Sequence, residues 1–279
     1  MFCISKGKIT RNATIRKIVV IFAVENMRNY LINRPAKDIL AAIVFCVVVC
    51  VLVLSAIWAY RQFISTPPYV DPEKYPIKGI DISRHNGKID FEKVKDDGIE
   101  FVFIKASEGE THIDSLFNHN FENARLAGLK VGAYHFFRFD KDGVQQAVNF
   151  LSMVGSRHTD LGLVVDVEKT GNPTDISAEE VRKNLSAMVD YMNLLGHRVM
   201  IYTNYEGYYE YISEILPGYP LWICRFRENP INAEWTFWQF DHHGKVNGIK
   251  GDVDLNVFCG KKEEWERFLN GDIWPYTGN

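Results

Sequence analysis

The chain has 279 residues, of which 47% are hydrophobic and 24% are charged, and its formal net charge is -3 at pH 7. This composition excludes a wholly disordered chain, a collagen and a small disulfide-stapled domain, and the acidic balance argues against a nucleic-acid-binding protein. The charge is unevenly distributed, because residues 1–38 hold eight Lys and Arg against two acidic residues, a net charge of +6 that leaves -9 for the remainder. The basic N-terminal segment and the acidic remainder of the chain indicate that the two parts lie in different environments.

Residues 39–60 contain no charged side chain and end in the aromatic residues Trp58 and Tyr60. At a helical rise of about 1.5 Å, these residues span roughly 33 Å, enough to cross a bilayer core. The alternatives are a buried core helix, which would show a polar face, and a signal peptide, for which residues 56–59 are a poor cleavage site. We therefore predict a single-pass anchor. The basic flank predicts that residues 1–38 are cytoplasmic and that the chain after Arg61 is exported, into a periplasm or outside the cell.

Two details of the anchor and the exported part stay open in the sequence. Met27 begins a compact basic lead-in to the anchor, so translation starts at either Met1 or Met27. Cys224 and Cys259 lie in the exported part, where they form either a disulfide or two buried thiols.

A proline-containing linker is predicted over residues 61–74, a single domain over residues 75–270 and a short tail over residues 271–279. Apolar, β-rich runs recur through the domain, and we take eight of them as strands. The predicted strands cover residues 79–82, 101–105, 130–136, 163–167, 199–203, 221–224, 236–240 and 253–258.

Helices are predicted in most of the early gaps between these strands, where an apolar stripe ends at a glycine or follows a capping signal. The clearest signal is the capping box Ser177-Ala178-Glu179-Glu180. The predicted helices cover residues 117–127, 144–154, 178–195 and 205–216.

The order of these elements predicts the fold class. Strands alternate with helices at first, whereas the last three strands leave no room for long helices between them. This order favours a parallel barrel with an irregular closing half. A doubly wound open sheet is the alternative, but no Gly-x-Gly-x-x-Gly loop follows the first strand.

Four carboxylates fall near predicted strand ends, where such barrels place catalytic groups: Asp81, Asp166, Glu168 and Asp254. Asp166 and Glu168 are two residues apart on one strand, so both side chains face the barrel mouth. Repulsion and desolvation should raise the pKa of one member, leaving a protonated acid beside a charged base, as glycoside hydrolysis requires. The alternative is a strand that runs into solvent with two surface carboxylates, and the two further aspartates favour the catalytic interpretation.

Aromatic residues gather at the same strand ends, and rings beside carboxylates suit a carbohydrate groove. Tyr134 lies near the end of the third strand, Tyr202 near the end of the fifth, Trp222 on the sixth and Trp238 on the seventh.

Taken together, these segments resemble the glycoside hydrolase family 25 muramidases, bacterial and phage lysozymes with a (β/α)5(β)3 barrel. The similarity covers nearly all of residues 79–258 in the order of the family, and it does not extend to residues 1–70. The resemblance implies an α/β fold, an irregular TIM-like barrel, here preceded by one transmembrane helix. The matching stretches are GIDISRHNGKIDFEKV, FVFIKASEGETHID, GLKVGAYHFFRF, LVVDVEKT, VMIYTN, PLWICRF, WTFWQFDHHGKVNGIKG and VDLNVF.

The resemblance implies cleavage, with retention of configuration, of the β-1,4 bond between N-acetylmuramic acid and N-acetylglucosamine in peptidoglycan. Glu168 matches the general acid, and Asp166 matches a stabilising carboxylate or nucleophile, with attack by the acetamido group of the substrate as the alternative. Asp81 and Asp254 match further active-site carboxylates. Residues that match positions lining the groove are Lys105, Tyr134, Tyr202, Trp238 and Gln239, to which we add Trp222 as a substrate-binding residue.

The expected partners are peptidoglycan glycan strands and, through residues 39–60, a membrane. No metal or other cofactor is expected, because His242 and His243 lack a ligand spacing and suit an exposed loop. Asn86 and the Cys224-Arg225 pair depart from the common pattern of the family. Two rival functions stay open: an anchor that binds the wall without cutting it, and a hydrolase of chitin.

Overall fold

The computed structural model describes residues 35–65, 68–226, 228–230 and 234–272. The chain divides into two compact units, Met1–Ile64 and Ser65–Asn279. The predicted cytoplasmic segment lies outside the described residues except for residues 35–38, and so do both candidate starts, Met1 and Met27. Of the predicted tail, only residues 271–272 are described.

Helix α2 (Ala36–Ser65) contains the predicted membrane segment and continues into the residues predicted as linker. Its part Ala36–Tyr60 is, among the described residues, the one helix long and apolar enough to cross a membrane, and none of that stretch is buried. Leu, Val, Ile and Phe side chains are exposed along it. A helix that is apolar on all sides needs an apolar environment, which a bilayer supplies.

In the described part of the second unit, eight strands close into a barrel, as predicted, because β1 pairs with β2 on one side and with β9 on the other. Neighbouring strands are parallel from β1 to β8, whereas β9 runs antiparallel to both β8 and β1. The unpredicted β3 (His112–Ile113) extends β2 as a short hairpin outside the ring. The barrel strands are β1 (Lys78–Ile82), β2 (Phe101–Glu108), β4 (Lys130–Phe136), β5 (Leu163–Asp166), β6 (Val199–Asn204), β7 (Leu221–Cys224), β8 (Phe237–Gly244) and β9 (Val253–Phe258).

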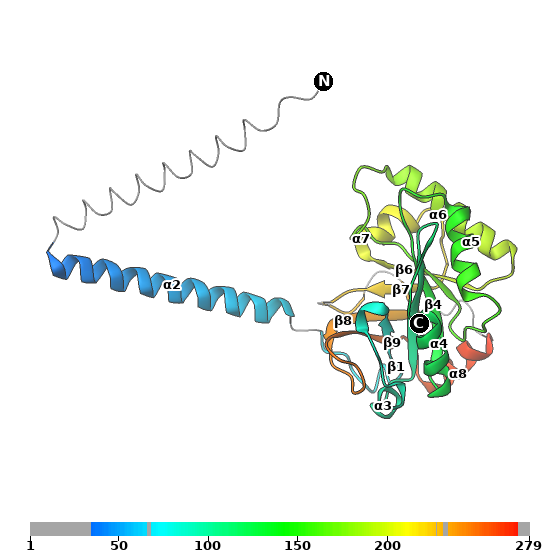
Figure 1. Ribbon diagram of the computed structural model, residues 1–279, viewed down its shortest axis with the longest axis horizontal. Coiled ribbons are helices and arrows are strands. Elements are labelled where there is room, and N and C mark those ends of the chain that lie inside the picture. The colour runs from blue at the N-terminus through cyan, green and yellow to red at the C-terminus, as the bar shows by residue number, and fades with distance from the viewer. Residues whose placement is uncertain (1–34, 66–67, 227, 231–233, 273–279) are drawn as a thin grey trace, which may run out of the picture. The chain divides into compact units, whose positions relative to one another are not determined.

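Three of the four predicted helices are present, and Figure 1 shows them on the outside of the strands as α4 (Phe117–Leu126), α5 (Gly143–Val154) and α6 (Ala178–Leu194). The Ser177 side chain accepts a hydrogen bond from the Glu180 N–H and begins α6, as its sequence indicates. The prediction of one α-helix over residues 205–216 is wrong. The structure has one turn of α7 (Tyr205–Gly207), followed by a π-helical turn at Tyr208–Ile212. The unpredicted elements are a 3-10 turn at Arg84–Asn86, α3 (Phe91–Asp96) and α8 (Lys262–Asn270).

The barrel interior is filled by aromatic rings. Alternation along β2 turns Phe101 and Phe103 inward and Val102 outward against the helices. Phe103 stacks on Trp222, with the ring centroids 4.3 Å apart and an interplanar angle of 21°. A Cβ on Gly79 would lie 2.2 Å from the Phe101 ring, so this strand position needs glycine. These rings occupy the barrel interior below its mouth.

Cys224 and Cys259 are both free thiols in the structure, which decides between the two alternatives left by the sequence. Cys224 is level with Gln239 on β8, whereas the Cys259 N–H bonds to the carbonyl oxygen of Thr236, which lies three residues before Gln239 and immediately precedes β8. At about 3.3 Å per residue, the two cysteines are roughly 10 Å apart along the strands alone, which exceeds the reach of a disulfide.

Candidate active site

A cavity of about 370 Å³ lies at the barrel mouth, where the parallel strands end. All four predicted carboxylates line it, together with four of the six predicted substrate-binding residues. The lining is Asp81, Tyr134, Asp166, Glu168, Thr170, Tyr202, Trp222, Phe226, Gln239, His242 and Asp254.

Asp81 and Asp254 meet across the seam that closes the barrel. The antiparallel pairing of β1 with β9 places Asp81 directly opposite Asp254. The barrel rule predicts catalytic residues at the C-terminal ends of strands. Asp254 instead stands near the start of β9. It reaches the same mouth because β9 runs in the opposite direction.

A buried network of hydrogen bonds holds Asp81. Gln239 Nε2 and Asn256 Nδ2 each donate to Asp81 Oδ2 at 2.8 Å. The amide oxygens are held in turn, because Tyr202 OH donates to Gln239 Oε1 at 2.8 Å and Trp222 Nε1 donates to Asn256 Oδ1 at 2.7 Å. Sequence reasoning missed Asn256, although its position two residues after Asp254 on one strand was a usable signal. The network fixes the Asp81 carboxylate as an acceptor.

Burial gives Asp81 and Asp254 different proton affinities. Burial raises the pKa of Asp81, although the amide donors of Asn256 and Gln239 oppose this. Burial, followed by the charge of Asp81, raises the pKa of Asp254 to about 9. At neutral pH Asp254 is therefore the protonated member, and its carboxyl group shares a hydrogen bond with the Asp81 carboxylate.

Asp166 and Glu168 face the cavity from the end of β5. Val167 between them is fully buried in the layer between the strands and the helices, as the alternation predicts. Asp166 is 7% exposed, and its Oδ1 is buried without a hydrogen-bond partner among the described residues, whereas Glu168 is more accessible. Burial and then the charge of Glu168 raise the pKa of Asp166 well above its usual range. Burial and then the charge of Asp81 raise the pKa of Glu168 to about 6.

The chain that carries Glu168 is held on both sides of the residue. Asn172 Nδ2 donates to the Glu168 carbonyl oxygen at 2.9 Å. The Lys169 ammonium bonds to Glu206 and Glu210, both at 2.6 Å, which joins the loop to the first turns after β6. These contacts hold the backbone on both sides of Glu168, whose side chain lines the cavity.

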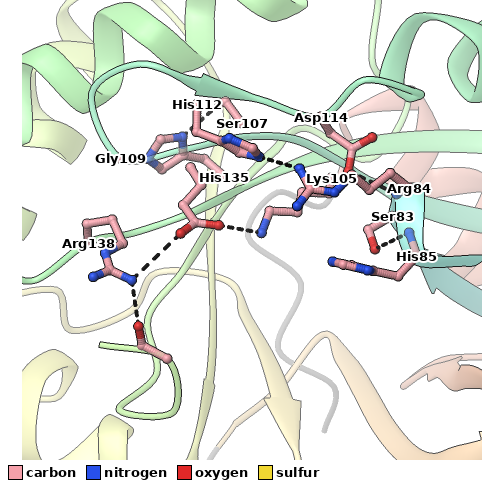
Figure 2. A network of polar contacts seen from close by, with 12 residues as sticks. Ser83, Arg84, His85, Lys105, Ser107, Gly109, His112, Asp114, His135 and Arg138 are labelled. Carbon is pink, nitrogen blue, oxygen red and sulfur yellow. Dashed lines mark hydrogen bonds and ion pairs between the residues drawn. The ribbon is translucent and has the colours of Figure 1, made fainter. Parts of the chain in front are cut away.

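Lys105 pairs with Tyr134 in the sheet and is not part of the cavity lining. Figure 2 shows the polar network that contains it: Lys105 Nζ bonds to Glu108 Oε2 at 2.8 Å, and Arg138, which lies 3.7 Å from Glu108 Oε1, also donates to the Gly171 carbonyl oxygen. The positive charge of Lys105 opposes the upward shifts in the pKa of Asp166 and Glu168. Its place in this structure is therefore that of an electrostatic neighbour of the pair.

Trp238, the other predicted substrate-binding residue outside the lining, is fully buried on the outer side of β8. Alternation turns Phe237 and Gln239 inward, so Trp238 packs against Tyr75 and Trp235 and donates from Nε1 to the Arg225 carbonyl oxygen at 2.8 Å. This position supports the wall of the barrel and offers no surface to a ligand in the cavity.

Three lining residues were not predicted: Thr170, Phe226 and His242. Phe226 follows β7, so the grouping of aromatic residues at strand ends was a signal that could have found it. His242, which the sequence places in an exposed loop pair, belongs to β8 and reaches the cavity rim.

Paired acids at the mouth of an irregular parallel barrel are the site of a glycoside hydrolase. The model of the glycosyl hydrolases family 25 matches residues 80–249, and the chain belongs to this family, as the sequence motifs predict.

Particular relatives agree with this assignment. The chain is 37% identical over 209 residues to the uncharacterized protein YegX of Escherichia coli (strain K12), which covers 72% of this chain and 76% of that protein. It is 32% identical over 202 residues to Lysozyme M1 of Streptomyces globisporus, covering 66% and 68%. A family 25 glycosyl hydrolase from Bacillus anthracis has a similar structure, with a TM-score of 0.66, 36% identity and coverage of 72% of this chain and 96% of that one. The predicted fold class is confirmed.

Proposed function

We propose that this protein is a muramidase, which hydrolyses the β-1,4 bond between N-acetylmuramic acid and N-acetylglucosamine in peptidoglycan. The observation that carries the proposal is the Asp166/Glu168 pair beside the Asp81/Asp254 pair in one cavity over an aromatic floor. Relatives named as lysozymes, such as Lysozyme M1, support this choice of substrate.

In this proposal Glu168 is the general acid. Its pKa of about 6 keeps a proton on the carboxyl group at mildly acidic pH, and it is more accessible than Asp166. Glu168 transfers that proton to the glycosidic oxygen as the bond to the anomeric carbon breaks. A water molecule then gives a proton to Glu168 and bonds to the anomeric carbon, displacing the group that bonded there when the glycosidic bond broke.

Asp166 would supply the stabilising charge. Two interacting carboxyl groups share one proton over a range of pH. Burial and the charge of Glu168 raise the pKa of Asp166 well above its usual range, so Asp166 competes for this proton, and the catalytic state in this proposal is the one with the proton on Glu168 and the negative charge on Asp166. That charge favours an oxocarbenium-like transition state, whether the new bond forms with Asp166 or with the acetamido group of the substrate. Asp81, held as an acceptor by Gln239 and Asn256, would bind a hydrogen-bond donor of the same sugar ring.

We further propose that residues 39–60 of α2 anchor residues 75–270, the catalytic domain, on the exported side of a membrane. The apolar stretch in α2 is longer than the roughly 7–15 apolar residues of a signal peptide. The exported side is where the proposed glycan substrate is accessible.

The test of the chemistry is Glu168→Gln, which keeps the shape of the side chain and removes the titrating proton. Release of soluble fragments from purified peptidoglycan should fall at least ~100-fold, the typical contribution of a general acid. Glu179→Gln on the exposed face of α6 is the matched control and should retain wild-type activity. Near-normal cleavage by Glu168→Gln would contradict the role of Glu168.

The same assay separates the rival functions. A protein that only binds the wall would release nothing from peptidoglycan, and a chitin hydrolase would cleave chitin oligomers in preference to peptidoglycan. The presence of all four carboxylates in the cavity favours a hydrolase over a binding module.

A further inference from the structure

Phe226 and His242 form an aromatic wall at the rim of the cavity, which we call the Phe226/His242 wall. Their ring centroids are 4.3 Å apart, with an interplanar angle of 50°. The two residues come from different segments, the chain after β7 and the strand β8, and both line the cavity. Neither has a part in the chemistry proposed for the carboxylates.

An irregularity in β8 is what brings His242 to the cavity. In a regular strand, residues three apart face opposite sides, yet Gln239 and His242 line the same cavity. The register explains this: Gln239 pairs with Asn256 and Asp241 pairs with Leu255, so two residues of β8 advance against one of β9. Such a bulge re-aims the side chains that follow it.

Strand β8 has a second register shift against β9, between Asp241 and Gly244. A Cβ on Gly244 would lie 2.3 Å from the Leu255 side chain, so this position needs glycine. Between the paired residues Asp241/Leu255 and Gly244/Val253, His242 and His243 together lie opposite Asp254, and of these two only His242 lines the cavity. The wall therefore borders the carboxylate end of the cavity.

The His242 ring is suited to contact with an uncharged face. Burial, and then the charge of the neighbouring His243, lower the pKa of His242 below its usual value. His243 itself does not line the cavity, and its Nδ1 lies 3.1 Å from Asp252 Oδ2. At neutral pH the wall thus consists of two neutral rings.

We propose that the Phe226/His242 wall stacks on a second hexosamine ring of the glycan, next to the ring that reacts over Asp166 and Glu168. This subsite rests on the proposed function. The carboxylates and the floor of Tyr134, Tyr202 and Trp222 surround the reacting ring. The wall stands outside that floor, where the next sugar of the chain passes. The C–H groups on a pyranose face are attracted to the negative face of an aromatic ring.

The experiment measures binding in a Glu168→Gln background, so that the ligand survives. Soluble glycan chains prepared from peptidoglycan are titrated calorimetrically into this parent and into parents that also carry His242→Ala, Phe226→Ala or His242→Phe. Loss of one stacked ring should raise the dissociation constant roughly tenfold in each alanine variant. His242→Phe should bind as the parent does, because it keeps the ring and removes the nitrogen atoms. His119→Ala, on the exposed face of α4, is the matched control.

All variants should have the melting temperature of the parent, which shows that they fold. A variant that melts at a lower temperature is replaced by His242→Leu or Phe226→Leu, which keep the bulk of the side chain without a ring. Unchanged binding by the alanine variants would overturn the subsite. Weak binding by both His242→Ala and His242→Phe would mean that a ring nitrogen bonds to the ligand, which overturns stacking. If the parent bound no glycan although the wild type degraded peptidoglycan, the subsite alone would fail. If neither occurred, the proposed function would fail first and the subsite with it.

Discussion

Lys105 is the positive charge that acts on both members of the catalytic pair, and it is held in place by Glu108. Burial pushes the pKa values of Asp166 and Glu168 upward, while Lys105 opposes that shift. The balance leaves the pKa of Glu168 at about 6. Under the proposed mechanism, activity should therefore decline as the pH rises through 6, because Glu168 loses the proton that it must donate.

The first prediction at this scale concerns Asp166→Asn. Removing the negative neighbour of Glu168 weakens the hold of Glu168 on its proton, so the alkaline limb of the pH–rate profile should move to lower pH. The rate should also fall, because the stabilising charge is lost. Asp190→Asn, on the exposed face of α6, should change neither. An alkaline limb that stays in place in the residual activity of Asp166→Asn would show that the two carboxyl groups do not interact.

The residues of the site were predictable to different degrees. The i, i+2 spacing of Asp166 and Glu168 on an apolar strand is visible in the sequence. Trp238 is a different case, because an aromatic residue near a strand end faces either side, and only the strand register shows that this one faces outward. Asn256 shares a strand face with Asp254 two residues earlier, but its bond to Asp81 depends on the pairing of the first and last barrel strands, which the sequence does not show.

At the scale of elements, α5 and α6 pack closely against each other. Gly143 begins α5, and a Cβ there would lie 1.8 Å from the Asn184 carbonyl oxygen in the backbone of α6. The neighbouring atom is backbone and has no rotamer with which to move away. Glycine at this position lets the two helices pack together on the outside of the barrel.

The second prediction follows from this contact. Gly143→Ala should lower the free energy of unfolding by about 2 kcal/mol or more, because α5 must shift to remove the overlap. Thermal or urea unfolding of the protein measures the loss. Gln145→Ala, an exposed position on the same helix, should lie within about 0.5 kcal/mol of the wild type. Equal stability of Gly143→Ala and the wild type would mean that the helices pack less closely than described.

Element types were predictable from the sequence where apolar residues were continuous or followed a clear period. All eight barrel strands are such runs, and the capping signals marked α6 correctly. The segment 205–216 shows the limit, because one helix was predicted there and the structure has one turn of α7 followed by a π-helical turn. The bulges of β8 also leave no mark in the sequence, since they depend on pairing with β9.

At the scale of the whole molecule, the barrel holds four carboxyl groups at its mouth, and burial raises the pKa of each of them. Asp254 has its pKa raised to about 9, so the folded state binds its proton more tightly than the unfolded state, where the value is near 3.8. The stability contributed by this proton is complete below pH 3.8 and is lost progressively as the pH rises toward 9.

The third prediction tests this linkage with Asp254→Asn, which cannot ionise. The melting temperature of the variant should exceed that of the wild type by more at pH 9 than at pH 5. Hydrolysis should be impaired, since the residue belongs to the site. Asp190→Asn should show no such trend with pH. A difference between variant and wild type that is the same at both pH values would contradict the raised pKa of Asp254.

The fourth prediction concerns the orientation of the anchor. The basic flank of residues 39–60 should keep the N-terminus in the cytoplasm. A reporter that works only after export should be active when fused after Asn279 and inactive when fused after Lys37. The opposite pattern would reverse the proposed topology and separate the catalytic domain from its substrate.

The seam between β1 and β9 has a further consequence for the timing of activity. Asp81 is contributed by the first barrel strand, whereas Asn256, one of its two amide donors, follows it by 175 residues and comes from the last strand, as does its neighbour Asp254. A chain that leaves the ribosome or threads through a membrane channel with its N-terminus first has half a site until its final strand arrives. Under the proposed topology, a nascent enzyme is therefore inert in transit and first becomes able to cut when residues 253–258 have emerged beside the wall.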